Sequence, residues 1–193
     1  MARVTTSKIL DNTAISAFIN EIRSIEMIEV CRNEYILVTT DCVQRETSER
    51  FSRETIDINY KNINVFRKTG DKKYDQALDY LVNRYPYLHE GELSAFLLAL
   101  LDYELTGNPY FFITDDRKMR EKICEIISSE VFLKIIGEAI HNYHFTGTIG
   151  LIKRLCQKGW FSEDDIKLII SDIKNSTFRI SDKLIGELSG CLK

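Results

Sequence analysis

The sequence predicts an α/β fold in three layers (α/β/α), with a central, mostly parallel sheet and additional helices at the C-terminus. Short apolar segments alternate with helical segments over the first two thirds of the chain, an order typical of parallel sheets with helices on both faces. From Glu130 onward the pattern is mainly helical. The length of 193 residues suits one domain with a small helical addition.

The predicted elements of the first half begin with a buried strand, Ser7–Leu10, which ends at Asp11. Thr13 is predicted to cap the helix that follows. Tyr35–Val38 is the next predicted strand, and the helix after it carries Glu46. The other predictions in this half are a helix over 24–33, a strand or irregular arm within 51–69, and a turn at 70–71.

The second half is predicted to centre on a strongly apolar helix over His89–Tyr103, preceded by an amphipathic helix over Lys73–Arg84. A third buried strand, Tyr110–Thr114, ends at two acids and leads into a basic helix. The C-terminal predictions are a helix within 131–140, a short strand and turn within 141–148, and helices over 149–159, from 163 to about 175, and from 182 onward.

Composition and charge limit the class of protein. A net charge of −3 makes a dedicated sequence-specific DNA binder a poor match, although a local basic patch would still serve an enzyme that binds nucleic acid. Five cysteines without a CxxC pair argue against a zinc ribbon or a disulfide scaffold. The longest apolar run, Phe96–Leu101, is too short to cross a bilayer, and no apolar leader is visible, so the expected location is the cytoplasm.

Acidic residues follow two of the predicted strands, Asp11 after the first and Asp115 and Asp116 after the third. Ligands of such sheets bind outside the carboxyl ends of the strands, so we expect these side chains to share one edge. Glu46 and Glu92 lie on helices of the same region. Crowded carboxylates repel one another and favour a bound cation, and Mg²⁺ or Mn²⁺ prefers oxygen ligands. The residues therefore predict a divalent-cation site.

Four short motifs in this order resemble a PIN domain: DNTAIS at 11–16, TTDCVQRE at 39–46, GELSAFLLAL at 91–100 and ITDDRKMR at 113–120. The C-terminal stretch, FTGTIGLIKRLCQKGWFSEDD followed by FRISDKLIGELSG, is similar to the end of a prokaryotic, toxin-type (VapC-like) PIN subfamily that carries a C-terminal helical extension. The resemblance covers nearly the whole chain in pieces. It implies a PIN-like nuclease domain over 1–160 and a helical extension over 161–193 packed on it.

The resemblance further implies a metal-dependent endoribonuclease that cleaves RNA with water activated by Mg²⁺ or Mn²⁺. An antitoxin protein as partner and a homodimer are implied as well. The implied catalytic residues are Asp11, Glu46, Glu92 and Asp116, and the implied metal ligands are Asp11, Glu92, Asp115 and Asp116. Supporting hydrogen bonds are expected from Ser16 and Thr114, and contacts to RNA phosphates from Arg117, Lys118 and Arg120.

Each of these residues also has an ordinary structural interpretation. Asp11 and one of the pair at 115–116 fit helix caps, and Glu92 lies in a first helical turn, which favours acids. The T-x-D form favours Asp116 within the pair, and Glu49 or Asp41 are alternatives to Glu46. The basic helix also fits a solvated face. His141 and His144 have helical metal-pair spacing but lack the glutamate of an HExxH motif, which favours two ordinary histidines.

Two other classes of protein remain open. One is a catalytically inactive PIN-like module that binds RNA or a protein. The other is a phosphotransfer domain, either a phosphatase or a receiver. The phosphatase pattern DxDx[TV] lacks its second aspartate in Asp11-Asn12-Thr13, and the aspartate and lysine of a receiver cannot both be placed.

Overall fold

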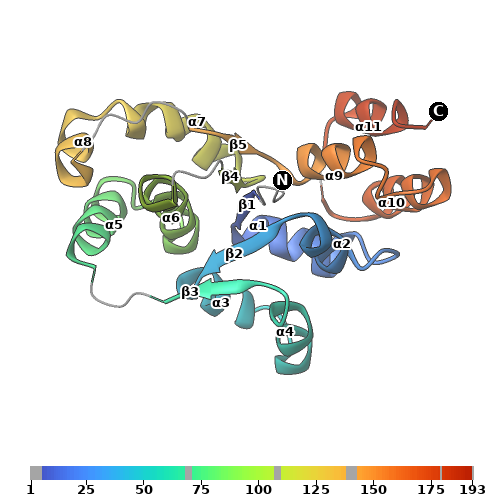
Figure 1. The fold of residues 1–193 in the computed structure, drawn as a ribbon, viewed down its shortest axis with the longest axis horizontal. Helices are drawn as coiled ribbons and strands as arrows, with labels where there is room; N and C mark the ends of the chain where they lie inside the picture. The colour runs from blue at the N-terminus through green and yellow to red at the C-terminus, as the bar shows by residue number, and fades with distance from the viewer. Residues whose placement is uncertain (1–5, 68–70, 107–109, 138–142, 179, 193) are drawn as a thin grey trace.

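The predicted three-layer α/β/α architecture is confirmed by a computed structural model, which describes residues 6–67, 71–106, 110–137, 143–178 and 180–192 (Figure 1). The described strands form one five-stranded sheet in the order β3-β2-β1-β4-β5, and all neighbouring pairs are parallel. These strands are β1 (Ser7–Leu10), β2 (Ile36–Thr40), β3 (Asn64–Phe66), β4 (Tyr110–Ile113) and β5 (Phe145–Thr146).

The strand order creates a topological switch beside β1. The chain leaves β1 toward β2 and β3 on one side, then returns to place β4 and β5 on the other. Leu10 and Ile113, the last residues of β1 and β4, are direct partners in the register. A crevice outside the carboxyl ends of two such strands is where open parallel sheets usually bind ligands. The segments after residues 10 and 113 are therefore brought side by side at the favoured position.

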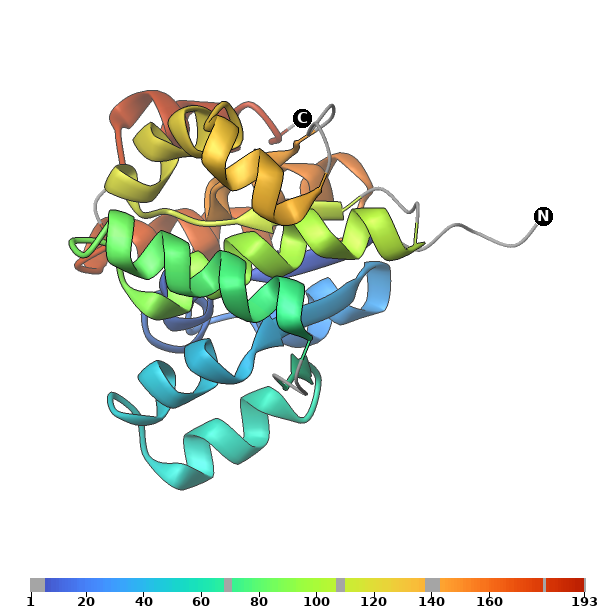
Figure 2. The ribbon, with the colours of Figure 1, turned by 90° about the vertical axis from the view of Figure 1, so that its left-hand side faces the viewer.

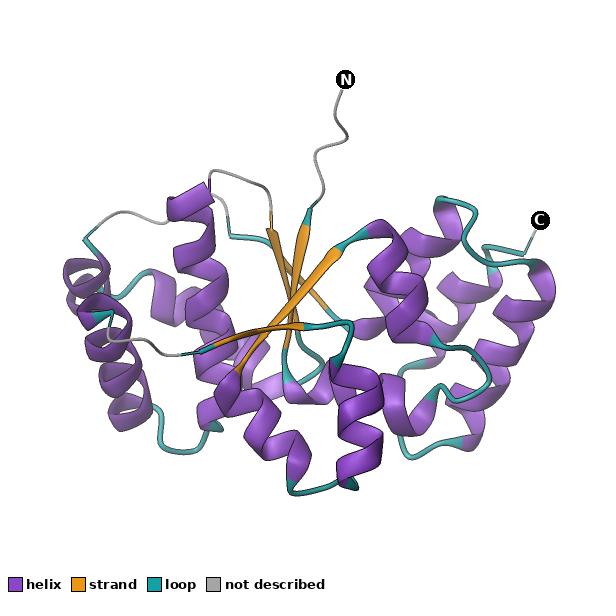
Figure 3. Ribbon diagram, turned by 60° about the horizontal axis from the view of Figure 1, so that its bottom comes forward, coloured by secondary structure: helices purple, strands orange, loops and turns teal. Residues whose placement is uncertain are grey.

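Helices cover both faces of the sheet, as Figure 3 shows. On one face lie α5 (Lys72–Arg84) and α6 (Glu90–Thr106), which run side by side in Figure 2. On the other lie α2 (Met27–Glu34) and α9 (Thr148–Gln157). The remaining described helices are α1 (Asn12–Ser16), the π-helix η1 (Ala17–Glu21), α3 (Asp41–Ser48), α4 (Arg53–Tyr60), α7 (Arg117–Ile127), α8 (Glu130–Ile136), α10 (Glu163–Asn175) and α11 (Asp182–Ser189).

The predicted central helix, α6, is buried on all sides from Leu93 to Leu101 because it packs against β1, β2 and β4 as well as α3 and α5. This explains its lack of an amphipathic pattern. Among the described residues, no helix combines the length and the apolar character needed to cross a membrane. All five cysteines are described, and all are free thiols.

The C-terminal helices pack on the rest of the fold rather than projecting from it. Helix α11 contacts both α9 and α10. The backbone N–H and hydroxyl of Thr177 donate to Glu21 at the end of η1, at 3.1 and 2.9 Å. The backbone N–H and hydroxyl of Ser24 donate to Asp172 of α10, both at 2.8 Å. These contacts hold the C-terminal segment against the N-terminal helices.

A lysine lies in the middle strand of the sheet. Lys8 is only 2% exposed, and its Nζ lies 3.7 Å from the centroid of the Phe111 ring and 4.5 Å from that of Tyr35. Burial, reinforced by the nearby cations Arg154 and Lys158, lowers the pKa of Lys8 to about 7. Aromatic faces offset part of the cost of burying a cation, but they do not replace water fully.

The structure corrects several of the predicted local elements. The segment 51–69 contains a helix, α4, before the short strand β3, because Ser52 caps the helix and Ile56 and Tyr60 are buried one turn apart. The cap of the first helix is Asp11 and not Thr13. His144 precedes β5 and stacks near Phe111, so it is not on a helix; His141 lies outside the described residues.

Candidate functional site

The candidate site lies at the switch between β1 and β4, where two acidic loops leave the sheet together. The backbone N–H of Asp11 donates to the carbonyl of Ile113 at 3.2 Å, which continues the pairing of the two strands by one residue. The Thr13 hydroxyl donates to Asp11 Oδ1 at 2.7 Å and accepts from the backbone N–H of Asp115 at 3.0 Å. A single hydroxyl thus joins the two loops.

Asp11 is fully buried, and its two carboxylate oxygens have different surroundings. Its Oδ1 caps α1 by accepting from the backbone N–H of Ala14 at 2.9 Å. Its Oδ2 is buried and makes no hydrogen bond of good geometry among the described residues, although the Thr114 hydroxyl is near enough to favour the ionised form. Burial raises the pKa of Asp11 to about 7. One buried carboxylate oxygen of Asp11 therefore has no well-aligned partner among the described residues, which is costly unless a ligand supplies one.

Glu92 lies in the first turn of α6 and is only 4% exposed. Burial, followed by the negative charges of Asp116 and Asp11 and, more weakly, of Glu46, raises the pKa of Glu92 to about 8. The backbone N–H of His89 donates to Glu92 Oε2 at 3.4 Å and opposes this shift only in part. Glu92 is therefore close enough to the other three carboxyl groups expected from the sequence for their charges to act on it.

Glu46 reaches this group from α3. Its Oε1 accepts from the backbone N–H of Gly91 at 2.7 Å, beside Glu92. A Cβ on residue 91 would lie 2.5 Å from Glu46 Oε2, so glycine is needed for this close approach. The sequence left Glu49 and Asp41 as alternatives to Glu46. In the structure, Glu46 is near enough to Glu92 for its charge to act on the Glu92 carboxyl.

The two neighbouring aspartates after β4 have different surroundings. Asp116 caps α7 through Oδ1, which accepts from the backbone N–H of Met119 at 2.7 Å, and its charge acts on Glu92. Asp115 instead accepts from the backbone N–H of Thr148, at 3.0 and 3.2 Å to its two oxygens, and also from the Thr148 hydroxyl. Asp115 therefore caps α9, whose own N-cap residue is Gly147. Both oxygens of Asp115, an implied metal ligand, are engaged in the described structure.

The expected supporting residues act locally. The Thr114 hydroxyl accepts from the backbone N–H of Asp116 at 3.1 Å and lies near Asp11, whereas Ser16 donates to Asn12 Oδ1 at 3.2 Å. One residue that sequence reasoning missed as part of the site is Thr13, which the sequence predicts only as a helix cap. A D-x-T sequence, in which a threonine hydroxyl can turn back to the preceding aspartate, is the signal that could have identified it.

The three expected phosphate-binding residues, Arg117, Lys118 and Arg120, are all exposed on α7. Arg117 pairs with Glu121 at 2.7 Å, a solvent-exposed ion pair of small energetic value. Arg120 lies with its guanidinium carbon 5.9 Å from the centroid of the Phe145 ring, and its charge opposes the raised pKa of Asp115. Arg117 and Arg120 line a pocket next to the acids, and Lys118 does not.

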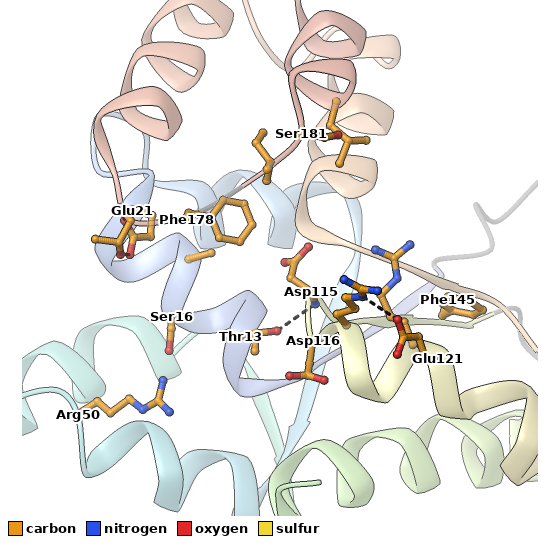
Figure 4. Close-up of a pocket in the computed structure, with 16 residues that line it drawn as sticks. Thr13, Ser16, Glu21, Arg50, Asp115, Asp116, Glu121, Phe145, Phe178 and Ser181 are labelled. Carbon is orange, nitrogen blue, oxygen red and sulfur yellow. Dashed lines mark hydrogen bonds and ion pairs between the residues drawn. The ribbon is translucent and has the colours of Figure 1, made fainter. Parts of the chain in front are cut away.

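This pocket has a volume of about 830 Å³ and lies between α1, α7 and the C-terminal segment (Figure 4). Asp115 and Asp116 line it from one side, and Arg50, which sequence reasoning did not select, lines it beyond the end of α3. The opposite wall comes from the chain after α10. Of the four converging carboxyl groups, only Asp116 lines this pocket, so the pocket adjoins the acidic group and does not enclose it.

The acidic group satisfies the chemistry of a divalent-cation site. It supplies only hard oxygen donors, it contains a buried oxygen without a well-aligned partner, and the charges of Asp116, Asp11 and Glu46 add to burial in raising the pKa of Glu92. Among the described residues, however, no three His, Cys, Asp or Glu side chains are already arranged around one point at metal-ligand spacing.

No protein-family model matches the chain, and no curated protein sequence or solved structure is significantly similar to it.

Proposed function

We propose that this protein is a divalent-metal-dependent endoribonuclease of the PIN type. The observation that carries the proposal is the convergence of Asp11, Glu46, Glu92 and Asp116 from four separate segments at the switch point of a parallel sheet, where burial and then the charges of the other three raise the pKa of Glu92. The resemblance of the four motifs to PIN domains and the adjacent arginine-lined pocket support the same function.

Asp11, Glu92 and Asp116 are the residues that would hold Mg²⁺ or Mn²⁺, with Glu46 completing the acidic group. Asp115 is a weaker candidate because it caps α9. A divalent cation supplies two things in such a site: it lowers the pKa of water and offsets the negative charge that develops on a phosphodiester. Without it, burial and mutual repulsion hold protons on Asp11 and Glu92 near neutral pH.

The remaining contributions come from the chain itself. Arg117 and Arg120 bind the phosphates that flank the scissile bond, a term independent of base sequence. Thr13 positions Asp11 by bonding its Oδ1, which leaves the buried Oδ2 available to a metal ion. A cytoplasmic location, a toxin role with an antitoxin partner and homodimerisation remain parts of this proposal that rest on the sequence and the resemblance alone.

The deciding experiment measures cleavage of single-stranded RNA with Mn²⁺, together with direct Mn²⁺ binding, for the wild type and the variants D11N, E92Q and D116N. Asp57→Asn, which changes an exposed residue that pairs with Arg53 on α4 at 3.9 Å, is the matched control. We expect the control to retain cleavage and binding and the three site variants to lose at least 100-fold in cleavage, about the loss that follows removal of a group that stabilises the transition state. Equal cleavage by wild type and D11N would refute the site. Absence of cleavage in all proteins, with RNA binding retained, would favour the inactive module.

A further inference from the structure

The pocket beside the acids has a second wall that the proposed function does not use. Phe178, Ile180 and Leu184 line it from the C-terminal segment, and Phe145 lines it from β5. All four apolar side chains are half-buried and face the cavity (Figure 4 shows the rings of Phe178 and Phe145). Apolar groups left partly exposed around a polar crevice are typical of a ligand site.

The position of this wall is fixed without any ligand. Thr177 is bonded to Glu21 through its backbone N–H and hydroxyl, and the backbone N–H of Phe178 donates to Ser176 Oγ at 3.1 Å. The hydrogen bonds from Thr177 and its neighbours lower the pKa of Glu21, so these contacts persist at neutral pH. A wall that is already in place loses little conformational entropy when a ligand binds.

The chemistry of the pocket matches one class of ligand. Its apolar wall carries the ring of Phe178. Its charged lining consists of three arginines (Arg50, Arg117 and Arg120) and four carboxylates (Glu21, Asp115, Asp116 and Glu121). A nucleotide combines a flat base, which stacks on aromatic rings, with a phosphate, which pairs with arginine. The volume of about 830 Å³ falls in the range usual for small-ligand sites and exceeds the need of one nucleotide.

We infer that the pocket is a nucleotide subsite in which Phe178 stacks on the base next to the scissile phosphate of single-stranded RNA. This inference rests on the proposed ribonuclease function and adds a base-binding subsite and a positioning residue. A base inside a duplex cannot reach Phe178 without leaving its stack, so the subsite selects unpaired RNA. The C-terminal segment thereby becomes part of the substrate site.

The first test measures binding of uridine, cytidine, adenosine and guanosine 5′-monophosphates by calorimetry, with ribose 5-phosphate as the matched ligand that lacks a base. In the wild type we expect the nucleotides to bind more tightly than ribose 5-phosphate. The variant F178L, which retains apolar volume but has no ring, should lose that difference, a weakening of roughly 5- to 100-fold, and F178Y should retain it. Melting temperatures check that each variant is folded.

The second test compares cleavage of unpaired and duplex RNA by the same proteins. We expect F178L to raise KM for unpaired RNA while kcat changes little, because the ring positions substrate and does not touch the reacting atoms. If wild type and F178L cleave RNA with the same KM, and neither binds nucleotides more tightly than ribose 5-phosphate, the subsite is overturned. The ribonuclease proposal is then left intact. A third outcome is that nucleotides bind more tightly than ribose 5-phosphate to the wild type but not to F178L, while no protein cleaves RNA. That outcome would support the subsite and refute the ribonuclease function. Binding of an arginine-containing peptide in place of nucleotides would overturn the subsite in favour of a protein partner.

Discussion

The backbone N–H of Gly91 donates a 2.7 Å hydrogen bond to Oε1 of Glu46, which fastens the first turn of α6 to α3 beside the buried carboxyl of Glu92. Two helices that are distant in sequence thus deliver one acid each to the same place. The bond also gives Glu46 a fixed orientation, because the N–H belongs to the backbone of a buried helix. The position of Glu46 in the site, and therefore its expected effect on metal binding, depends on this hydrogen bond.

The substitution G91A tests whether Glu46 belongs to the site. A Cβ would lie 2.5 Å from Glu46 Oε2, so the carboxylate must move and lose its backbone donor. Because the clash involves the end of a flexible side chain, we expect the free energy of unfolding to change by less than about 1 kcal/mol. Mn²⁺ affinity, measured by calorimetry, should fall roughly 10-fold or more.

Gly186→Ala is the control for this substitution. Gly186 lies in α11, and a Cβ added there would meet no atom within 4 Å, so the new methyl group enters open space. Alanine should therefore stabilise the helix by about 0.5–1 kcal/mol and leave Mn²⁺ affinity unchanged. Unchanged affinity in G91A as well would remove Glu46 from the site.

Substitutions of the two adjacent aspartates, Asp115 and Asp116, are expected to have different effects, the first mainly on stability and the second mainly on activity. D115A removes the acceptor for the Thr148 N–H and hydroxyl at the start of α9, so urea denaturation should show a loss of about 1–3 kcal/mol. D116N leaves a good cap for α7, because asparagine also accepts from the N3 N–H, and should cost less than about 1 kcal/mol while cleavage is lost. The reverse pattern would assign the site to Asp115.

The metal-free protein should become less stable as the pH rises. Burial, with like-charge repulsion for Glu92, raises the pKa of Asp11 from 3.8 to about 7 and that of Glu92 from 4.5 to about 8. Between the unfolded and folded pKa values the folded protein holds more protons than the unfolded chain, so stability is highest at the acidic end of this window and falls as pH approaches 8.

Chemical denaturation in the presence of EDTA, across this pH window, measures the effect. D11N and E92Q should each reduce the slope of stability against pH. Adding Mn²⁺ at the alkaline end should restore stability to the wild type but not to these variants. A wild-type slope that neither substitution changes would show that other groups are responsible.

Replacing the buried Lys8 by methionine should stabilise the protein. Burial lowers the pKa of Lys8 from 10.5 to about 7, so below pH 7 the folded state carries the full cost of the buried cation. Between pH 7 and 10.5 the folded amine is neutral while the unfolded one is still charged, so this cost declines as the pH rises. We expect K8M to gain on the order of 1–3 kcal/mol near neutral pH, reduced by the lost cation–π contacts, and to gain less as the pH rises toward 10.5, where the unfolded lysine is neutral too. A loss of stability at neutral pH would contradict this account.

The sequence predicts the layered fold well because the information is local. The apolar segments before Asp11 and Asp115 are short, uninterrupted and bounded by turn residues, and α6 is too apolar to lie anywhere but in the core. Helix α4 was missed although Ile56 and Tyr60 have helical spacing, because the surrounding polar residues also alternate in a strand-like way.

The candidate site could be predicted only in part from the sequence, because the contacts of its acidic residues come from segments that are distant in the sequence. Asp115 and Asp116 are neighbours, and only the arrival of Thr148 from α9 engages the first and leaves the second to act on Glu92. The choice of Glu46 over Glu49 likewise follows from its bond to Gly91. Phe178 has no local signal, because its exposure depends on how Thr177 docks on η1.

The strand order also has a consequence for the newly made chain. Asp11 emerges from the ribosome before its partner loop, which follows β4, the fourth described strand in the sequence, and the wall that carries Phe178 emerges later still. If the acidic group is a ribonuclease site, a nascent chain that is still attached to its own messenger lacks part of it until the loop after β4 has been synthesised. The topology would then delay the assembly of the nuclease site relative to the synthesis of its first acid.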